Sequence, residues 1–278
     1  MKIRIAKSAG FCFGVKRAIK IANETLKEKK KAYMLGDIVH NEDVTNQLDK
    51  AGIKRIKRLG NGKGKTLLIR AHGSSRKLFN KALQLGYSIV DATCPMVKEI
   101  QNIAIKNELK GYHIIIIGDK KHDEVHSIMG QLKNKAVVID NIKNIPWEKI
   151  KKMKKAAVVV QSTQNMEKVK EIVNVLNACV GELKFFNTIC KPTRTKQEEI
   201  KTMPLVNDVM IIIGSKTSAN TKRLYEISKS LNKNSYWVNS GNGIMRKWFE
   251  NKKSVGITAG ASTPESTTRE IIKYIKKF

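Results

Sequence analysis

The sequence has few of the residues on which several protein classes depend. Its 278 residues include four cysteines, and aromatic side chains make up 6%. Disulfide scaffolds are short, secreted and rich in cysteine, so this chain is not one of them. No apolar run approaches the ~20 residues of a membrane-spanning helix, and residues 1–5 read as a strand, not as the start of a signal peptide. We therefore expect a soluble, cytoplasmic protein.

Acidic residues are also scarce. The chain has 24 Asp and Glu against 54 Lys and Arg, a formal net charge of +30. The lysines are dispersed in short runs, which favours a solvated basic surface. Attraction to nucleic acid, to an anionic substrate or to an acidic protein partner stays open. Because no RNA-recognition signature with interleaved aromatics is present, a nucleic-acid partner is the weaker of these readings.

Short apolar runs rich in β-branched residues alternate with amphipathic stretches such as 15–29, 166–176 and 221–231. Near-continuous apolar strands separated by helices are typical of parallel sheets that helices cover on both faces. The sequence therefore predicts an α/β protein. Beyond the N-terminal strand, the predicted strands are 32–35, 66–70, 87–90, 113–117, 136–139, 156–160, 184–186, 209–213, 235–238 and 254–258.

The loops that follow these strands repeat in kind along the chain. One kind carries a cysteine: Cys94 follows Cys12 by 82 residues, and Cys190 follows Cys94 by 96, each close to a third of the length. Repetition at a fixed period indicates repeated structural units. We predict three similar α/β units around a pseudo-threefold axis. They comprise residues 13–94, residues 95–190, and residues 191–278 completed by residues 1–12.

The cysteine spacing bears on metal chemistry. Zinc ribbons need close cysteine pairs, which are missing here. Three thiolates converging on an axis could hold an iron–sulfur cluster with one iron open to substrate. Spacing alone is also compatible with a zinc site, with redox thiol chemistry or with core packing. Cys179 lies outside the pattern and is interpreted as ordinary core.

Polar side chains at the same strand ends could bind a diphosphate. Such an anion needs neutral or cationic donors and helix N-termini. The candidates are His40, His72, His122, Ser218, Asn220 and Ser262. Glu124 is a candidate proton donor, the alternative being a solvated charge. The hydroxyls of Ser162 and Thr163 could relay the proton or bind and orient the substrate. His113 and His126 receive no role.

Several short motifs, taken in order, carry a family resemblance. They are Ala9–Val15, Val39–Asn41, Arg70–Gly73, Asp91–Pro95, His122–Val125, Thr188–Cys190, Asn220–Leu224 and Gly260–Glu265. Over its whole length the sequence resembles the 4-hydroxy-3-methylbut-2-enyl diphosphate reductases of the non-mevalonate isoprenoid pathway.

That resemblance implies a cloverleaf of three α/β domains around a [4Fe-4S] cluster bound by Cys12, Cys94 and Cys190. It implies that the six donors named above bind the diphosphate and that Glu124 delivers a proton. The implied reaction is reductive dehydroxylation of the allylic alcohol, whose hydroxyl would bind the open iron, to isopentenyl and dimethylallyl diphosphate. An acidic electron donor such as ferredoxin or flavodoxin would suit the basic surface.

The chain departs from the family pattern at three places. Ser162 stands where the family usually has threonine, which keeps the hydroxyl and removes a methyl group. Ala219 replaces a second serine, so that a backbone N–H is left to face phosphate. Lys196-Gln197 replaces an Arg-Gln pair, a change that we expect to be tolerated.

Overall fold

The computed structural model describes residues 1–277; Phe278, at the end of the third predicted unit, lies outside the described residues. The chain forms three four-stranded parallel sheets with helices between the strands, which confirms the α/β prediction. Contacts divide it into two compact units. The first contains Met1–Lys16, Val39–Gln47 and Lys191–Phe278, and the second contains Arg17–Ile38 and Leu48–Cys190. The boundaries predicted at residues 94 and 190 stay a prediction.

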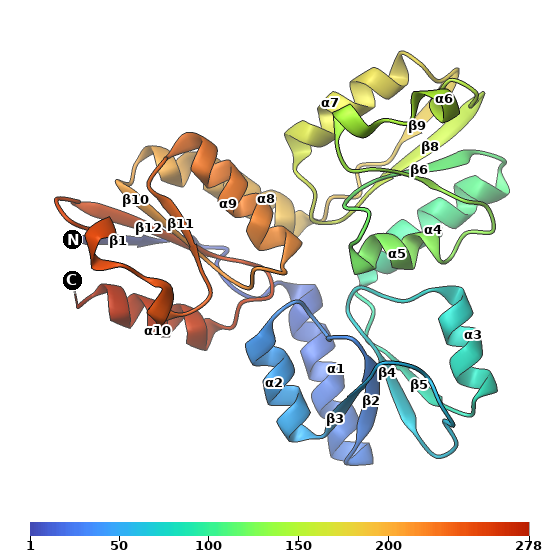
Figure 1. Ribbon diagram of the computed structural model, residues 1–278, viewed down its shortest axis with the longest axis horizontal. Helices are drawn as coiled ribbons and strands as arrows, with labels where there is room; N and C mark the ends of the chain where they lie inside the picture. The colour runs from blue at the N-terminus through green and yellow to red at the C-terminus, as the bar shows by residue number, and fades with distance from the viewer. Residues whose placement is uncertain (278) are drawn as a thin grey trace. The chain divides into compact units, whose positions relative to one another are not determined.

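The second unit holds two of the sheets (Figure 1). One has the strand order β3-β2-β4-β5, with α3 (Arg76–Gln84) packed on it through Ala82. Its strands are β2 (Ala32–Leu35), β3 (Ile53–Ile56), β4 (Thr66–Ile69) and β5 (Ser88–Asp91). The chain enters this sheet through α1 (Phe13–Lys29) and reaches β3 through α2 (Glu42–Ala51).

The other sheet of this unit has the order β7-β6-β8-β9. Its strands are β6 (His113–Ile117), β7 (Val137–Ile139), β8 (Lys155–Val160) and β9 (Glu182–Phe185). Four isoleucines in succession occupy β6 because helices bury both of its faces. Helices α4 (Pro95–Leu109) and α5 (Asp123–Met129) cover one face, and α6 (Trp147–Ile150) and α7 (Met166–Asn177) cover the other (Figure 1).

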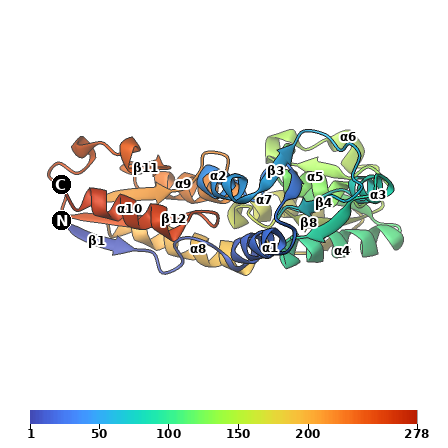
Figure 2. The ribbon, with the colours of Figure 1, turned by 90° about the horizontal axis from the view of Figure 1, so that it is seen from below.

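The first unit holds the sheet β1-β12-β10-β11. Its strands are β1 (Lys2–Ile5), β10 (Val209–Ile213), β11 (Ser235–Val238) and β12 (Ser254–Ala259). Helix α10 (Glu265–Ile275) lies in front of this sheet in Figure 2, and α8 (Lys191–Thr202) and α9 (Ala219–Leu231) pack on the opposite face. In this sheet, the N-terminal strand β1 pairs in parallel with β12, which lies near the C-terminal end of the sequence.

The three sheets repeat one topology. In each, the strand before a predicted cluster cysteine (β5, β9 or β1) is an edge strand that pairs with β4, β8 or β12, respectively. Each predicted strand is present to within two residues at either end, but β3 was not predicted. Its four residues do not show the apolar–polar alternation of a strand, because Lys54 and Arg55 are adjacent and both exposed on an edge strand. Within residues 1–277, no helix is long and apolar enough to cross a membrane.

Candidate active site

Each of the three cysteines is held by the same backbone hydrogen bond. The N–H of each donates to a carbonyl in the loop after the neighbouring strand: Cys12 to Ala261 at 3.0 Å, Cys94 to Ala71 at 2.9 Å, and Cys190 to Ser162 at 3.1 Å. Each cysteine also stands directly before a helix, α1, α4 or α8. The repeated loop chemistry noticed in the sequence thus corresponds to a repeated backbone geometry.

The thiols suit the role of metal ligands. All three side chains are partly buried, and Cys94 occupies the N-cap of α4 without using its sulfur for a capping bond. Pro95 at the first helical turn fixes the start of that helix, which sets the position of Cys94. Soft thiolate sulfurs are the donors that iron–sulfur clusters require. Cys179 packs against the hydrophobic core, as predicted, although it lies just beyond the end of α7.

Glu124 is buried and bonded to Ser162. The carboxylate is 2% exposed, and Ser162 is 7% exposed. Glu124 Oε1 accepts the backbone N–H of Ser162 at 2.6 Å, and its Oε2 accepts the Ser162 hydroxyl at 2.8 Å. The carbonyl of the same serine accepts the N–H of Cys190. The reading of Glu124 as a solvated charge is therefore wrong, and the carboxyl is joined to a cysteine loop through one residue.

Burial raises the pKa of Glu124 above its ordinary 4.5, and the nearby charge of Asp119 acts in the same direction. The two hydrogen bonds from Ser162 favour the charged form and oppose that shift. Desolvation is the largest of these influences. A carboxyl with a raised pKa holds its proton at higher pH than a solvated one does, as a general acid requires.

His72 and His122 meet edge to face in the second unit, with ring centroids 5.4 Å apart and planes at 86°. His122 is the N-cap of α5, and its Nδ1 accepts the N–H of Glu124 at 3.1 Å. A neutral His122 therefore carries its proton on Nε2, where it can donate to an anion. Gly73 follows His72 at φ +76°, and a Cβ there would lie 3.1 Å from Thr93 Cγ2, so this turn requires glycine.

A bidentate ion pair and a serine hold this histidine pair. Arg70 donates to both carboxylate oxygens of Asp123 at 2.7 and 2.8 Å, which ties the end of β4 to the start of α5. The Ser127 hydroxyl donates to the carbonyl of His72 at 2.7 Å. Sequence reasoning assigned these three residues no role. Arg70 and Asp123 do lie within two residues of a candidate histidine, which was the available signal.

In the first unit, the N-terminus of α9 gathers Ser218, Ala219 and Asn220. Ser218 is the N-cap, and its hydroxyl accepts the N–H of Thr221 at 3.3 Å. All three residues are less than 9% exposed. Among the described residues, neither the Nδ2 nor the Oδ1 of Asn220 has a hydrogen-bond partner. A buried amide without partners is costly unless a ligand satisfies it.

Ser262 and His40 are also joined within the first unit, since the Ser262 hydroxyl donates to the His40 carbonyl at 3.0 Å. Next to His40, Asn41 accepts the N–H of Val44 at 3.1 Å and so caps α2. The backbone around His40 is thus fixed from both sides. The sequence-predicted donors of this unit all lie in loops or helix starts beyond strand ends, as expected for a parallel sheet.

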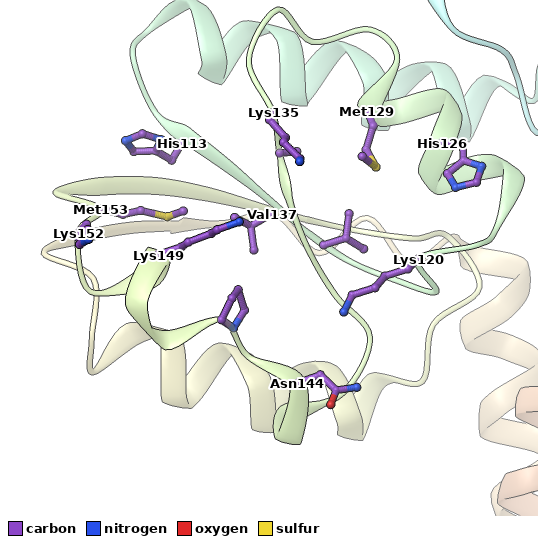
Figure 3. Close-up of a pocket in the computed structure, with 13 residues that line it drawn as sticks. His113, Lys120, His126, Met129, Lys135, Val137, Asn144, Lys149, Lys152 and Met153 are labelled. Carbon is purple, nitrogen blue, oxygen red and sulfur yellow. The ribbon is translucent and has the colours of Figure 1, made fainter.

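A separate groove of about 700 Å³ lies along the edge strand β7 (Figure 3). Its lining includes His113 and His126, together with Lys120, Lys135 and Lys149. His113 opens β6, as predicted, and His126 lies within α5. None of the predicted site residues lines this groove. Lysines along an exposed sheet edge protect it from pairing with other chains.

Known proteins match the chain over nearly its whole length. The profile of the family described as LytB protein matches residues 3–276. The chain belongs to the LytB family. This confirms the reductase-family resemblance drawn from the motifs.

Relatives of this LytB-family chain are named 4-hydroxy-3-methylbut-2-enyl diphosphate reductase. One from Aquifex aeolicus (strain VF5) is 39% identical over 280 residues, 99% of this chain and 96% of the relative. One from Campylobacter fetus subsp. fetus (strain 82-40) is 41% identical over 283 residues, 100% of this chain and 98% of the relative.

Two solved structures resemble the fold. The structure of (E)-4-hydroxy-3-methyl-but-2-enyl diphosphate reductase, described as the terminal enzyme of the non-mevalonate pathway, has a TM-score of 0.73 and 39% identity and covers 100% of both chains. The E-1-hydroxy-2-methyl-but-2-enyl-4-diphosphate reductase of Plasmodium falciparum has a TM-score of 0.90 and 28% identity, covering 98% of this chain and 87% of that one.

Proposed function

We propose that this chain reduces 4-hydroxy-3-methylbut-2-enyl diphosphate to isopentenyl and dimethylallyl diphosphate, the last step of non-mevalonate isoprenoid synthesis. The observation that carries the proposal is the buried Glu124–Ser162 pair, which is bonded to the Cys190 loop. Removal of a hydroxyl as water needs a general acid, and a buried carboxyl with a raised pKa suits that role. The full-length relatives that bear the reductase name support the same reaction.

The proposed cofactor is a [4Fe-4S] cluster held by Cys12, Cys94 and Cys190, which leaves one iron without a protein ligand. Its support is the equivalence of the three cysteine loops, each with the same N–H bond and each at the start of a helix. When bound, such a cluster supplies electrons and a Lewis-acidic iron. Each of these N–H bonds fixes the backbone of its own cysteine loop where the loop meets the helix.

The proposed diphosphate donors are the residues predicted from the sequence. The first unit contains His40, Ser218, Ala219, Asn220 and Ser262, and the second contains His72 and His122. Asn220 supports the diphosphate proposal because its buried amide lacks partners among the described residues. The N–H groups at the start of α9, including that of Ala219, favour an anion through the helix dipole. A neutral His122 would carry its proton on Nε2 and so add a further donor. Holding the diphosphate would orient the allylic hydroxyl and keep water away from it.

Glu124 is the proposed proton donor. Burial raises its pKa, which favours the protonated form, and Ser162 positions both of its oxygens. The overall change replaces a C–O bond by a C–H bond and releases water, which consumes two electrons and two protons. Glu124 supplies one of these protons and regains it from solvent between turnovers. The Ser162 hydroxyl either relays this proton or orients the carboxyl.

The proposed electron donor is a small acidic protein such as ferredoxin or flavodoxin, and the proposed location is the cytoplasm. The net charge of +30 supports electrostatic steering of such a partner. Stopped-flow electron transfer should therefore slow as ionic strength rises. An electron-transfer rate that does not change with ionic strength would contradict an acidic protein as the electron donor.

An anaerobic assay tests the function directly. Anaerobically purified protein, given the allylic diphosphate and a reduced viologen dye, should oxidise the dye and form both products. Iron and sulfide analysis of the same sample should give about four of each per chain. Protein that folds but carries zinc, or no metal, would sink the cluster proposal and favour a zinc or thiol redox protein. Salt-sensitive binding to nucleic acid without reductase activity would favour the nucleic-acid alternative.

A further inference from the structure

Lys196 is buried although it carries a charge. It lies on α8, in the first unit, and its side chain is 2% exposed. Buried lysines are rare because removing an ammonium group from water is costly unless hydrogen bonds replace the lost solvent. The sequence showed only that Lys196 stands where the family usually has arginine. The structure gives it a specific set of partners.

The Lys196 ammonium donates to three backbone carbonyls. Its Nζ lies 3.1 Å from the carbonyl of Gly10 and 3.1 Å from that of Ala259, and it also donates to the carbonyl of Ser8. An ammonium group has three N–H donors, so these bonds use all of them. Two of the three carbonyls belong to the short segment between β1 and Cys12.

A second side chain of α8 holds the same segment. Glu199 accepts the N–H of Ser8 at 3.0 Å and also accepts the Ser8 hydroxyl. Lys196 and Glu199 are three residues apart, so they lie on one face of the helix. Lys196 donates to the carbonyls of the segment, and Glu199 accepts hydrogen bonds from its N–H and hydroxyl groups. Together they clamp residues 8–10 against the helix.

This segment runs directly into Cys12. Gly10 N–H donates to the Ala259 carbonyl at 3.3 Å, two residues before Cys12 N–H donates to Ala261. Gly10 has φ +93°, a conformation that side chains disfavour, so the backbone there turns sharply. The Lys196 ammonium therefore bridges the two strand ends whose loops fix the backbone of Cys12.

The charge of Lys196 also acts near the cysteine. Burial lowers its pKa to about 8 from 10.5, while Cys12 and Glu199 act against that shift. Both opposing groups can carry negative charge close to the ammonium. The ammonium therefore lies close enough to Cys12 and Glu199 for their charges to act on it.

We propose that Lys196 is a positioning residue that holds the Cys12 loop in its ligand geometry and sets the electrostatic environment of the cluster. The proposal rests on the proposed cluster. Outer residues that orient metal ligands typically change metal affinity or activity by about 10–100-fold when removed. The reduction potential of an iron–sulfur cluster also responds to nearby charge, and a buried cation favours the electron-rich state.

The test compares Lys196→Met with Lys196→Arg in the full chain, loaded with cluster under anaerobic conditions. Lys196→Met keeps length and apolar volume but removes the charge and the three donors. We expect its cluster to be lost to a chelator about 10-fold faster or more and its reduction potential to fall. Lys196→Arg, which restores a cation with several donors, should recover most of both properties. Lys229→Met is the matched control, since Lys229 is an exposed lysine of the same unit, and it should leave both unchanged.

Glu199→Gln is a second, independent test of the electrostatic effect. It keeps an acceptor for Ser8 but removes the negative charge. We expect its reduction potential to rise, opposite to the change in Lys196→Met. If Lys196→Met does not fold, the reduction potentials of Lys196→Arg and Glu199→Gln still test the proposal. Equal potentials in all folded variants, with changes only in melting temperature, would overturn the proposal and leave Lys196 a structural residue. If the unaltered chain takes up no iron, the proposed function itself fails, which is a different result.

Discussion

Replacing Glu124 by glutamine tests the proposed proton donor with little change of shape. The Gln oxygen can keep the 2.6 Å bond from the Ser162 N–H, and the new amide group faces the Ser162 hydroxyl, which can rotate to accept. The cost to folding is then about one neutral hydrogen bond, roughly 1 kcal/mol or less. The proton that the carboxyl could deliver is gone.

The expected effect on turnover follows from that loss. A positioned general acid contributes about 10²- to 10⁴-fold, which corresponds to about 2.7–5.4 kcal/mol in the barrier. We therefore expect kcat of Glu124→Gln to fall by at least about 100-fold. Iron content and KM for the diphosphate should stay within about twofold, since Glu124 is assigned to neither cluster nor diphosphate. Dye oxidation measured anaerobically at saturating substrate gives kcat directly.

Ser162→Ala is the matched partner of this experiment. It removes the 2.8 Å hydroxyl bond to Glu124 but keeps the backbone bond at 2.6 Å. If Ser162 only orients the carboxyl, turnover should fall by about 10-fold, the value of one hydrogen bond. A loss as large as that of Glu124→Gln would show that the hydroxyl lies on the proton path. A loss of less than 10-fold in Glu124→Gln itself would refute the general-acid assignment.

The pH dependence of stability gives a second readout of the same residue. The pKa of Glu124 is raised above 4.5 in the folded protein, so between pH 4.5 and that raised pKa the folded state binds more protons than the unfolded state. The free energy of unfolding must therefore decrease as pH rises through this window. Glu124→Gln lacks this titration. Urea melts across pH should show the native chain losing stability relative to the variant as pH rises, and parallel curves would contradict the raised pKa.

Three further predictions concern other parts of the site. Cys94→Ser should abolish reductase activity and lower the iron content while leaving the circular dichroism of the fold, and retained activity would remove Cys94 as a ligand. Asn220→Leu should raise KM for the diphosphate by about 10-fold or more. Its melting temperature should stay the same or increase, because an apolar group replaces a buried amide that lacks partners among the described residues. A large drop in melting temperature with unchanged KM would contradict this prediction. Asp123→Asn should cost about 1–2 kcal/mol in the free energy of unfolding by urea titration, since the bidentate pair with Arg70 is partly exposed, and an unchanged midpoint would show that the pair does not hold β4 to α5.

Among the described residues, the sequence by itself indicated every strand except β3, and it indicated the repeated loops. Strands such as 113–117 and 209–213 are buried on both faces, and their nearly continuous apolar residues indicate this from the sequence. The similar loops at the strand ends predicted three alike units, and the three sheets do share one strand order. β3 escaped prediction because Lys54 and Arg55 hide the apolar pattern of so short an edge strand.

Only the tertiary structure decided the chemistry of individual residues. In sequence, Glu124 is one charge among several in a polar loop, and its hydrogen-bond partner in the fold, Ser162, is 38 residues away. Lys196 read as a tolerated replacement until the fold brought it to Ser8, 188 residues away in sequence. Local sequence sets which backbone conformation a residue prefers. Desolvation, hydrogen-bond partners and pKa depend on the groups that folding brings around it from distant parts of the chain, and no short window of sequence contains them.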